Sequence, residues 1–144
     1  VRLLYLCMFT VPGIPNIYYG DEIGLAGRHD PDCRRAFPWE QTDSWDTALR
    51  DDIKRYIQLR HETPALSRGD FTILYSAGNV LAYQRRYHGK TAVIAFNAGD
   101  HPETLICPPN FRSHIPEKLV ESGEPLLANK EIVMPPRSGR VWAE

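Results

Sequence analysis

The spacing of hydrophobic positions in the first third of the chain predicts a helix, a strand and a long loop. An apolar run over residues 3–9, stopped by Pro12 and Gly13, predicts a buried helix, because it is too short for the ~20 residues of a membrane span. Residues 14–19 form a short apolar run without alternation, which is typical of a strand buried on both faces. Residues 21–46 have no periodicity, and long loops in compact domains are usually functional.

A second helix is predicted after this loop. Asp46 or Thr47 is placed to cap it, and Pro64 closes it. Its apolar face contains Leu49, Ile53, Tyr56 and Ile57. We expect the opposite face to be solvated, with Arg50, Asp51, Asp52 and Lys54.

The pattern changes near Arg68-Gly69 to short strand-like runs between turns. The predicted strands are Phe71–Tyr75, Val80–Tyr87, Thr91–Asn97 and Arg140–Ala143. The predicted turns are Ser76–Asn79, His88-Gly89, Ala98–Asp100, Ser122-Gly123 and Ser138-Gly139. This pattern indicates an antiparallel β-sandwich of roughly six to eight strands. The predicted fold is therefore α/β followed by all-β.

Composition narrows the classes of partner. A hydrophobic share of 42% and a charged share of 24% are those of a globular protein. The 17 basic and 18 acidic side chains give a formal charge of -1, which offers no electrostatic footprint for nucleic acid or an anionic membrane. We therefore expect neither partner.

The cysteines predict reduced thiols. Cys7, Cys33 and Cys107 are odd in number and widely spaced, so a disulfide framework or a zinc site is not expected. Together with the lack of a signal-peptide pattern in these residues, unpaired cysteines favour a cytoplasmic location. No cofactor is expected in this segment.

One composite motif is long and specific. Pro-Gly-Ile-Pro-Asn-Ile-Tyr-Tyr-Gly-Asp-Glu-Ile-Gly-Leu at 12–25 is followed by His-Asp-Pro-Asp-Cys-Arg-Arg at 29–35 and Phe-Pro-Trp-Glu at 37–40. Leu59-Arg60, Pro64-Ala65-Leu66 and Gly69-Asp70-Phe71 come after them in the same order. The whole resembles the C-terminal part of α-amylase-family enzymes, glycoside hydrolase family thirteen, and looks most like the neopullulanase, cyclomaltodextrinase and maltogenic amylase branch.

The resemblance implies a fold and an activity. It implies that residues 1–68 end a (β/α)8 catalytic barrel, with its eighth strand, subsite loop and eighth helix, and that residues 69–144 form the C-terminal β-sandwich. It implies retaining cleavage of α-glucosidic bonds in maltodextrin, cyclodextrin or pullulan, by two carboxyl groups and a covalent intermediate. In the family the catalytic carboxylates lie on earlier strands, so no catalytic residue is assigned here. The family's calcium ligands would also mostly lie upstream, so a calcium requirement is left open.

Asp30 and Arg34 are the candidate substrate-binding residues. The resemblance implies that an aspartate and an arginine at this spacing hold a glucose unit, which suits a carboxylate acceptor and a guanidinium donor fork. The alternative is that the two side chains pair only with each other. Asp21 and Glu22, adjacent on a strand end, would point to opposite faces and not flank one bond.

Two other kinds of site are possible in or near the same loop. A metal site would use His29, Asp30, Asp32 and Cys33, but they mix hard and soft ligands without a recognised spacing. The aromatic residues Tyr18, Tyr19, Phe37 and Trp39 could stack on sugar, with core packing as the alternative.

Two hypotheses for the whole chain follow. In the first, it is one piece of a glucan hydrolase whose missing barrel part is its partner, and the isolated piece self-associates through its exposed strand. In the second, it is a free-standing carbohydrate-binding or scaffolding module. The loop favours the first, because a free module would need only the sandwich.

Overall fold

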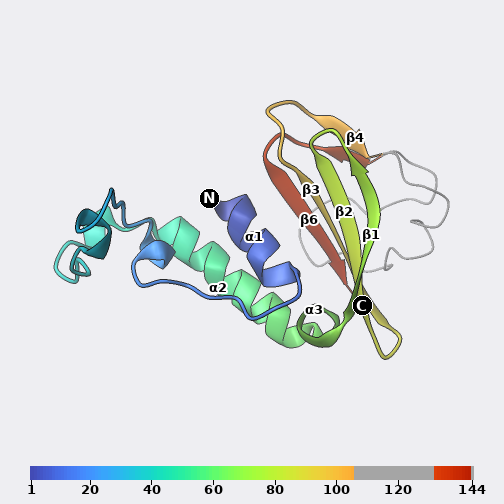
Figure 1. The fold of residues 1–144 in the computed structure, drawn as a ribbon, viewed down its shortest axis with the longest axis horizontal. Coiled ribbons are helices and arrows are strands. Elements are labelled where there is room, and N and C mark those ends of the chain that lie inside the picture. Colours follow the sequence, from blue (N-terminus) through green and yellow to red (C-terminus); the bar gives the residue numbers. More distant parts are fainter. Residues whose placement is uncertain (106–131, 144) are drawn as a thin grey trace.

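The computed structural model describes residues 1–105 and 132–143 as helices packed beside an antiparallel sheet (Figure 1). The helices are α1 (Arg2–Thr10), α2 (Thr47–Glu62) and α3 (Pro64–Arg68), with the short 3-10 helices η1 (Asp21–Ile23), η2 (Asp32–Arg34) and η3 (Thr42–Ser44). The strands are β1 (Asp70–Ala77), β2 (Val80–Tyr87), β3 (Lys90–Asn97), β4 (Glu103–Leu105), β5 (Ile132–Met134) and β6 (Ser138–Ala143). Cys107 and the predicted turn at Ser122-Gly123 lie outside the described residues.

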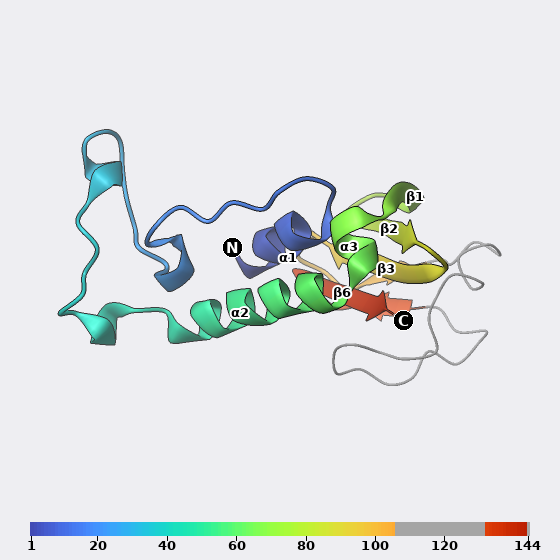
Figure 2. The same ribbon diagram turned by 90° about the horizontal axis from the view of Figure 1, so that it is seen from below.

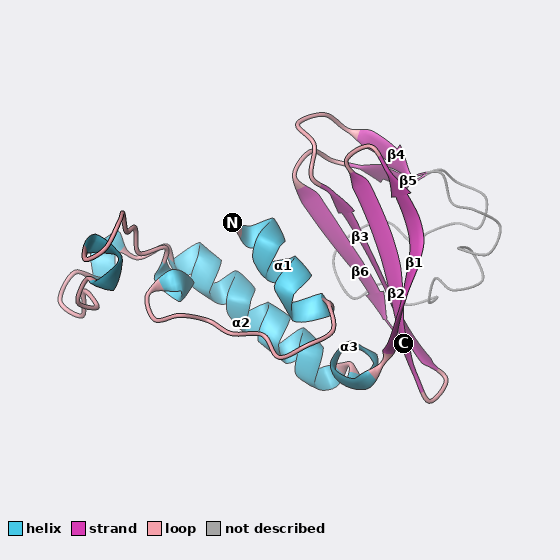
Figure 3. Cartoon of the chain, in the orientation of Figure 1, coloured by secondary structure: helices cyan, strands magenta, loops and turns pink. Residues whose placement is uncertain are grey.

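The strands form two antiparallel sheets, which Figure 3 shows in magenta. Four of them lie in the order β1-β2-β3-β6, and β4 pairs with β5. All four predicted strands are found, but the predicted turn at Ser138-Gly139 is wrong, because both residues belong to β6 and pair with Asn97 and Phe96. Gly139 continues the strand, although the dipeptide Ser-Gly has a high propensity for turns.

Strands β2, β3 and β6 of the larger sheet are buried on both faces, because their alternate side chains enter two different cores, whereas the edge strand β1 is mostly exposed. Val80, Ala82, Val93, Ala95 and Trp142 pack with Leu105, Ile132 and Met134 of the smaller sheet. The other face carries Tyr83, Ala92, Ile94, Phe96, Val141 and Ala143 against Leu6, Leu59, Ala65 and Leu66 of the helices. Strand β3 lies between the two cores and is buried from Thr91 to Asn97. The helices and the larger sheet therefore share the core on one face of that sheet.

Helix α1 approaches the sheet closely at Gly139. A Cβ atom built there would lie 2.6 Å from Leu6 Cδ2 and 3.0 Å from Leu3 Cδ1 and from Phe96 Cδ1. Any side chain at this position would therefore force the side chains of Leu6, Leu3 or Phe96 to shift.

Helix α2 begins as predicted but differs at two points. The Asp46 carboxylate accepts a 2.8 Å hydrogen bond from the amide of Leu49, which is the capping contact. Asp52 was expected in solvent, but this residue is only 7% exposed and its carboxylate pairs with Arg2 at 3.2 Å and with Arg55. Pro64 closes α2, as predicted, and also starts the separate helix α3, since proline fits the first turn of a helix.

Residues 14–19 are not a strand in this structure, contrary to the sequence-based prediction. They have no strand assignment, and Ile14 is 96% exposed and Tyr18 53% exposed. A strand needs a neighbouring strand on at least one side, and the described residues supply no such strand to this segment. The last unit of a barrel and the division at residue 68 therefore stay predictions.

Two arginines fasten the end of α1, where helix carbonyls lack partners. Arg60 donates to Phe9 O at 2.6 Å, Val11 O at 3.2 Å and Gly13 O at 2.6 Å. Arg85 donates to carbonyl oxygens from three elements, at 2.7 Å to Thr10, 2.9 Å to Gly69 and 3.2 Å to Asp70. Burial lowers the pKa of both guanidinium groups. The chain therefore leaves α1 in a fixed direction, toward the loop.

No described helix has the length and apolar character needed to cross a membrane.

Candidate functional site

The candidate site is the loop between residues 20 and 46, which extends away from helices and sheet (Figure 2). Its first turn needs Gly20, with φ of +89°, which places η1 against α2. Ile23 is buried there, and its carbonyl accepts a 3.0 Å hydrogen bond from the amide of Asp46. The loop is therefore closed at its base, although its tip is exposed.

Asp32 holds the tip of the loop together. Its carboxylate accepts hydrogen bonds from the Arg28 amide at 2.9 Å, from Arg35 Nε at 2.6 Å and from Arg35 Nη2 at 2.9 Å. The Arg35 hydrogen bonds are the main reason why the pKa of Asp32 lies below its ordinary value. Tyr19 Oη also donates to Arg35 O at 3.1 Å. Sequence analysis did not assign this role to Asp32, although its spacing of three from Arg35 was the available signal.

We call the bonds of Asp32 to Arg28 and Arg35 the Asp32 clamp. The structure brings Asp30 and Arg34 together beside it. Arg34 Nε lies 3.1 Å from Asp30 Oδ1, and the side chains are 71% and 65% exposed. Cys33 Sγ donates a weak hydrogen bond to the same carboxylate oxygen at 3.7 Å. The contact matches the pairing alternative, yet an arginine has five N–H donors and a carboxylate about four acceptor positions. Both groups therefore keep bonding capacity toward solvent.

Asp21 and Glu22 lie on η1 and not on a strand end, which corrects their expected setting. Burial first, and then the neighbouring charges of Asp21 and Glu22, raise the pKa of Tyr5. Glu22 also lines a hollow of about 420 Å³ between residues 17–19 and α2, together with Arg50 and Lys54. Both carboxylates therefore act on Tyr5, and Glu22 also borders the hollow.

A cluster of aromatic rings follows the clamp. The ring centroids of Phe37 and Trp39 are 4.3 Å apart, and Trp45 meets Phe37 edge-on at 5.5 Å. Trp45 Nε1 donates to Pro38 O at 3.1 Å. Trp39 is 73% exposed, so core packing does not describe it. The rings of Tyr18 and Tyr19 are tilted by 41° with their centroids 4.6 Å apart.

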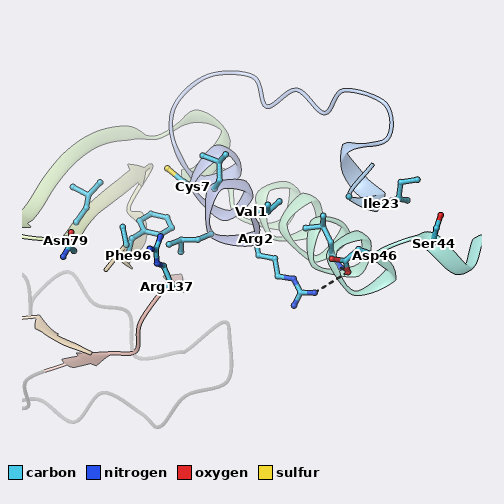
Figure 4. Close-up of a pocket in the computed structure, with 15 residues that line it drawn as sticks. Val1, Arg2, Cys7, Ile23, Ser44, Asp46, Asn79, Phe96 and Arg137 are labelled. Atoms are coloured by element: carbon cyan, nitrogen blue, oxygen red, sulfur yellow. Dashed lines mark hydrogen bonds and ion pairs between the residues drawn. The ribbon is translucent and has the colours of Figure 1, made fainter. Parts of the chain in front are cut away.

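A larger apolar groove of about 930 Å³ lies between α1, the start of α2 and one end of the sheet (Figure 4). Leu3, Leu4 and Cys7 line it from the helix, and Leu81 and Phe96 line it from the sheet. Its polar edge is the ion pair of Arg2 and Asp46, 3.5 Å apart. Among the described residues that line the groove, no cluster of polar groups would suit catalysis.

The described residues contain no group of three or more His, Cys, Asp or Glu that could hold a metal ion. In the set that the sequence offered for a metal, both oxygens of Asp32 accept hydrogen bonds, from the Arg28 amide and from Arg35.

Comparison with known proteins gives relatives along nearly all of the chain, although no family model matches it. The cyclomaltodextrinase of Thermoanaerobacter pseudethanolicus is 35% identical over 132 residues, 92% of this chain and 21% of that protein. Neopullulanase 2 of Thermoactinomyces vulgaris is 37% identical over 107 residues, which are 73% of this chain and 18% of the relative. The solved debranching enzyme of Nostoc punctiforme matches with a TM-score of 0.87 and 32% identity, over 99% of this chain and 30% of that structure. The chain thus spans about a fifth of the length of these curated relatives.

Proposed function

We infer, from the premise that this chain belongs to the α-amylase family, glycoside hydrolase family thirteen, that it forms the substrate-binding end of an α-glucan hydrolase. Its relatives carry the names of glucan hydrolases, among them cyclomaltodextrinase and neopullulanase. Maltodextrin, cyclodextrin or pullulan is the proposed substrate.

The exposed pair of Asp30 and Arg34 is the observation that carries this proposal. The clamp at Asp32 holds the turn between them, so their unused donors and acceptors need little ordering when a sugar binds. Neighbouring hydroxyl groups of one glucose unit can bridge a carboxylate and a guanidinium. In this proposal the ion pair opens partly and takes the glucose unit on the non-reducing side of the cleaved bond.

The cleavage itself is proposed to use carboxyl groups outside these 144 residues. A retaining mechanism needs a nucleophile and an acid about 5–5.5 Å apart across the bond. Asp21 and Glu22 are consecutive residues of η1, and no catalytic role is proposed for either of them. The chain would therefore meet the remainder of a barrel, and the exposed residues 14–19 would pair with it.

The proposed binding role is tested by calorimetric titration of the chain with maltoheptaose. Asp30→Asn and Arg34→Met should each weaken binding about tenfold, since each removes a charged partner of sugar hydroxyls. Asp43→Asn and Arg28→Met change exposed charges of the same loop and serve as controls. Equal affinity for all five proteins would refute the assignment of Asp30 and Arg34.

The proposed location of the catalytic groups is tested with a chromogenic maltoside. The chain alone should release no chromophore above the rate in buffer. Turnover that is abolished by Asp21→Asn or by Glu22→Gln would place the chemistry on this chain and contradict the proposal.

A free-standing binding module remains the alternative. Such a module would need only the sheets. In this structure the helices on either side of the loop share one core with the larger sheet. This observation favours the hydrolase proposal.

A further inference from the structure

Trp39 is an exposed ring on a fixed support. Its 73% exposure is unusual for a side chain with so large an apolar surface. Phe37 covers one side at a centroid distance of 4.3 Å with an angle of 44° between the rings. The opposite side is left available to a flat apolar partner.

The support beneath Trp39 is well anchored. Trp45 packs edge-on against Phe37 and donates from Nε1 to Pro38 O at 3.1 Å. The amide of Trp39 donates to Phe37 O at 2.9 Å, and the amide of Gln41 donates to Pro38 O at 3.1 Å. The Arg50 guanidinium lies 5.6 Å from the centroid of the Trp45 ring and extends the stack to α2. A partner of Trp39 would therefore meet a preorganised surface, which lowers the ordering cost of binding.

The surroundings of Trp39 suit a partner with an apolar face and a polar rim. Glu40 and Gln41 follow it and are exposed, so both can exchange hydrogen bonds with hydroxyl groups at the rim. A pyranose ring has this character, with C–H groups on its faces and hydroxyl groups around its edge.

We propose that Trp39 is an aromatic platform for a glucose unit of an α-glucan, at a position separate from the Asp30–Arg34 pair. The proposal rests on the proposed function for its α-glucan class, because stacking alone does not select the linkage. It adds a second point of contact, so a longer oligosaccharide gains affinity that a single glucose unit does not.

The test is a titration of the chain with maltoheptaose, followed by calorimetry and by the indole N–H signals of its tryptophans. Trp39→Ala should weaken binding about tenfold, and Trp39→Phe, which keeps a flat ring, should stay within about threefold. In the wild type the Trp39 indole signal should shift, whereas that of the fully buried Trp142 should not. Ile73→Ala removes another exposed apolar side chain, which lies on β1, and should leave the affinity unchanged.

Each of the other outcomes overturns the Trp39 platform, the Asp30–Arg34 pair, the α-glucan class, or a combination of them. Unchanged affinity in Trp39→Ala, with weakening in Asp30→Asn, removes the platform and leaves the proposed function standing. Affinity lost in Trp39→Ala but kept in Asp30→Asn and Arg34→Met supports the platform and removes the pair. No binding of maltoheptaose by the wild type overturns both, and equal binding of cellohexaose overturns the α-glucan class.

Discussion

Thr10 Oγ1 lies 2.6 Å from Tyr83 Oη, which joins the last residue of α1 to the middle of β2 through a buried hydrogen bond. Thr10 Oγ1 also lies 2.7 Å from Leu6 O, so the hydroxyl groups and the helix carbonyl form a short chain. Both residues are fully buried. The contact ties the helix that precedes the loop to the sheet that supports it.

Replacing Tyr83 by Phe should lower the free energy of unfolding by about 1–2 kcal/mol, because a buried hydroxyl partner of Thr10 is lost. Urea denaturation of both proteins measures the difference. Tyr18→Phe changes an exposed tyrosine and should have no measurable effect. A Tyr83→Phe protein as stable as the wild type would show that this hydrogen bond does not contribute to stability.

The same tyrosine predicts a dependence of stability on alkaline pH. Burial raises the pKa of Tyr83 above its ordinary value of 10.0, so above pH 10 the unfolded chain loses this proton before the folded chain does. The folded state then holds more protons, and the free energy of unfolding should fall as the pH rises. Denaturation curves between about pH 8 and 11, a range that includes the ordinary tyrosine pKa, should show a shallower fall for Tyr83→Phe. An identical fall would contradict the prediction.

Arg60→Met should destabilise the chain by about 2–3 kcal/mol, because carbonyl oxygens of Phe9, Val11 and Gly13 lose a charged donor. Lys54→Met is the matched control, since its partner Asp51 is 3.8 Å away and both side chains are exposed. Such a pair contributes about 0–1 kcal/mol. Thermal or urea unfolding gives both values, and equal losses in the two variants would argue against a special role for Arg60.

Gly139→Val should cost about 1–3 kcal/mol through overpacking against Leu6 and Phe96. The loss should be partly recovered in the double variant Leu6→Ala, Gly139→Val, because the two sites share one volume. A double-mutant cycle of unfolding free energies measures this coupling. Strict additivity would mean that the cost of Gly139→Val does not arise from crowding against Leu6.

Asp32→Asn should loosen the loop tip and weaken maltoheptaose binding, since Arg35 loses a two-point partner. The lowered pKa of Asp32 gives the sign of the pH effect: the clamp is intact above the ordinary value of 3.8 and is lost as the pH falls below it. The Arg35 Nε–H signal followed by NMR should therefore persist at neutral pH and broaden only in acid. Asp43→Asn serves as the control for a change of loop charge.

Much of the sheet could be predicted from the sequence, because alternating side chains, β-branched residues and turns are local signals. The four predicted strands and the turn at His88-Gly89 are found in the structure. The turn at Ser138-Gly139 was wrong because a local propensity gave way to pairing with β3 and to the space that α1 requires.

The setting of individual charged residues was harder to predict. The spacing of apolar residues places Asp52 on the polar face of α2. In the structure its carboxylate pairs with Arg2, which is fifty positions earlier in the chain. Arg85 likewise looks like an ordinary strand residue. Such contacts join distant segments, and no local spacing indicates them.

The candidate loop could be located from its motif, but its internal bonding could not be predicted. Asp30 and Arg34 are adjacent in space, as their spacing of four permits. The role of Asp32 depends on a backbone amide of Arg28 and on the fork of Arg35. Pattern reasoning therefore found the pair and overlooked the residue that holds the turn.

Arg85 has a mechanical consequence for the end of α1. Its guanidinium contacts carbonyl oxygens from the end of α1, the end of α3 and the start of β1. Any sliding of the helices over the sheet would break several of these bonds in the same movement. A force that pulls on the end of α1 is thus transmitted to the sheet through this one side chain.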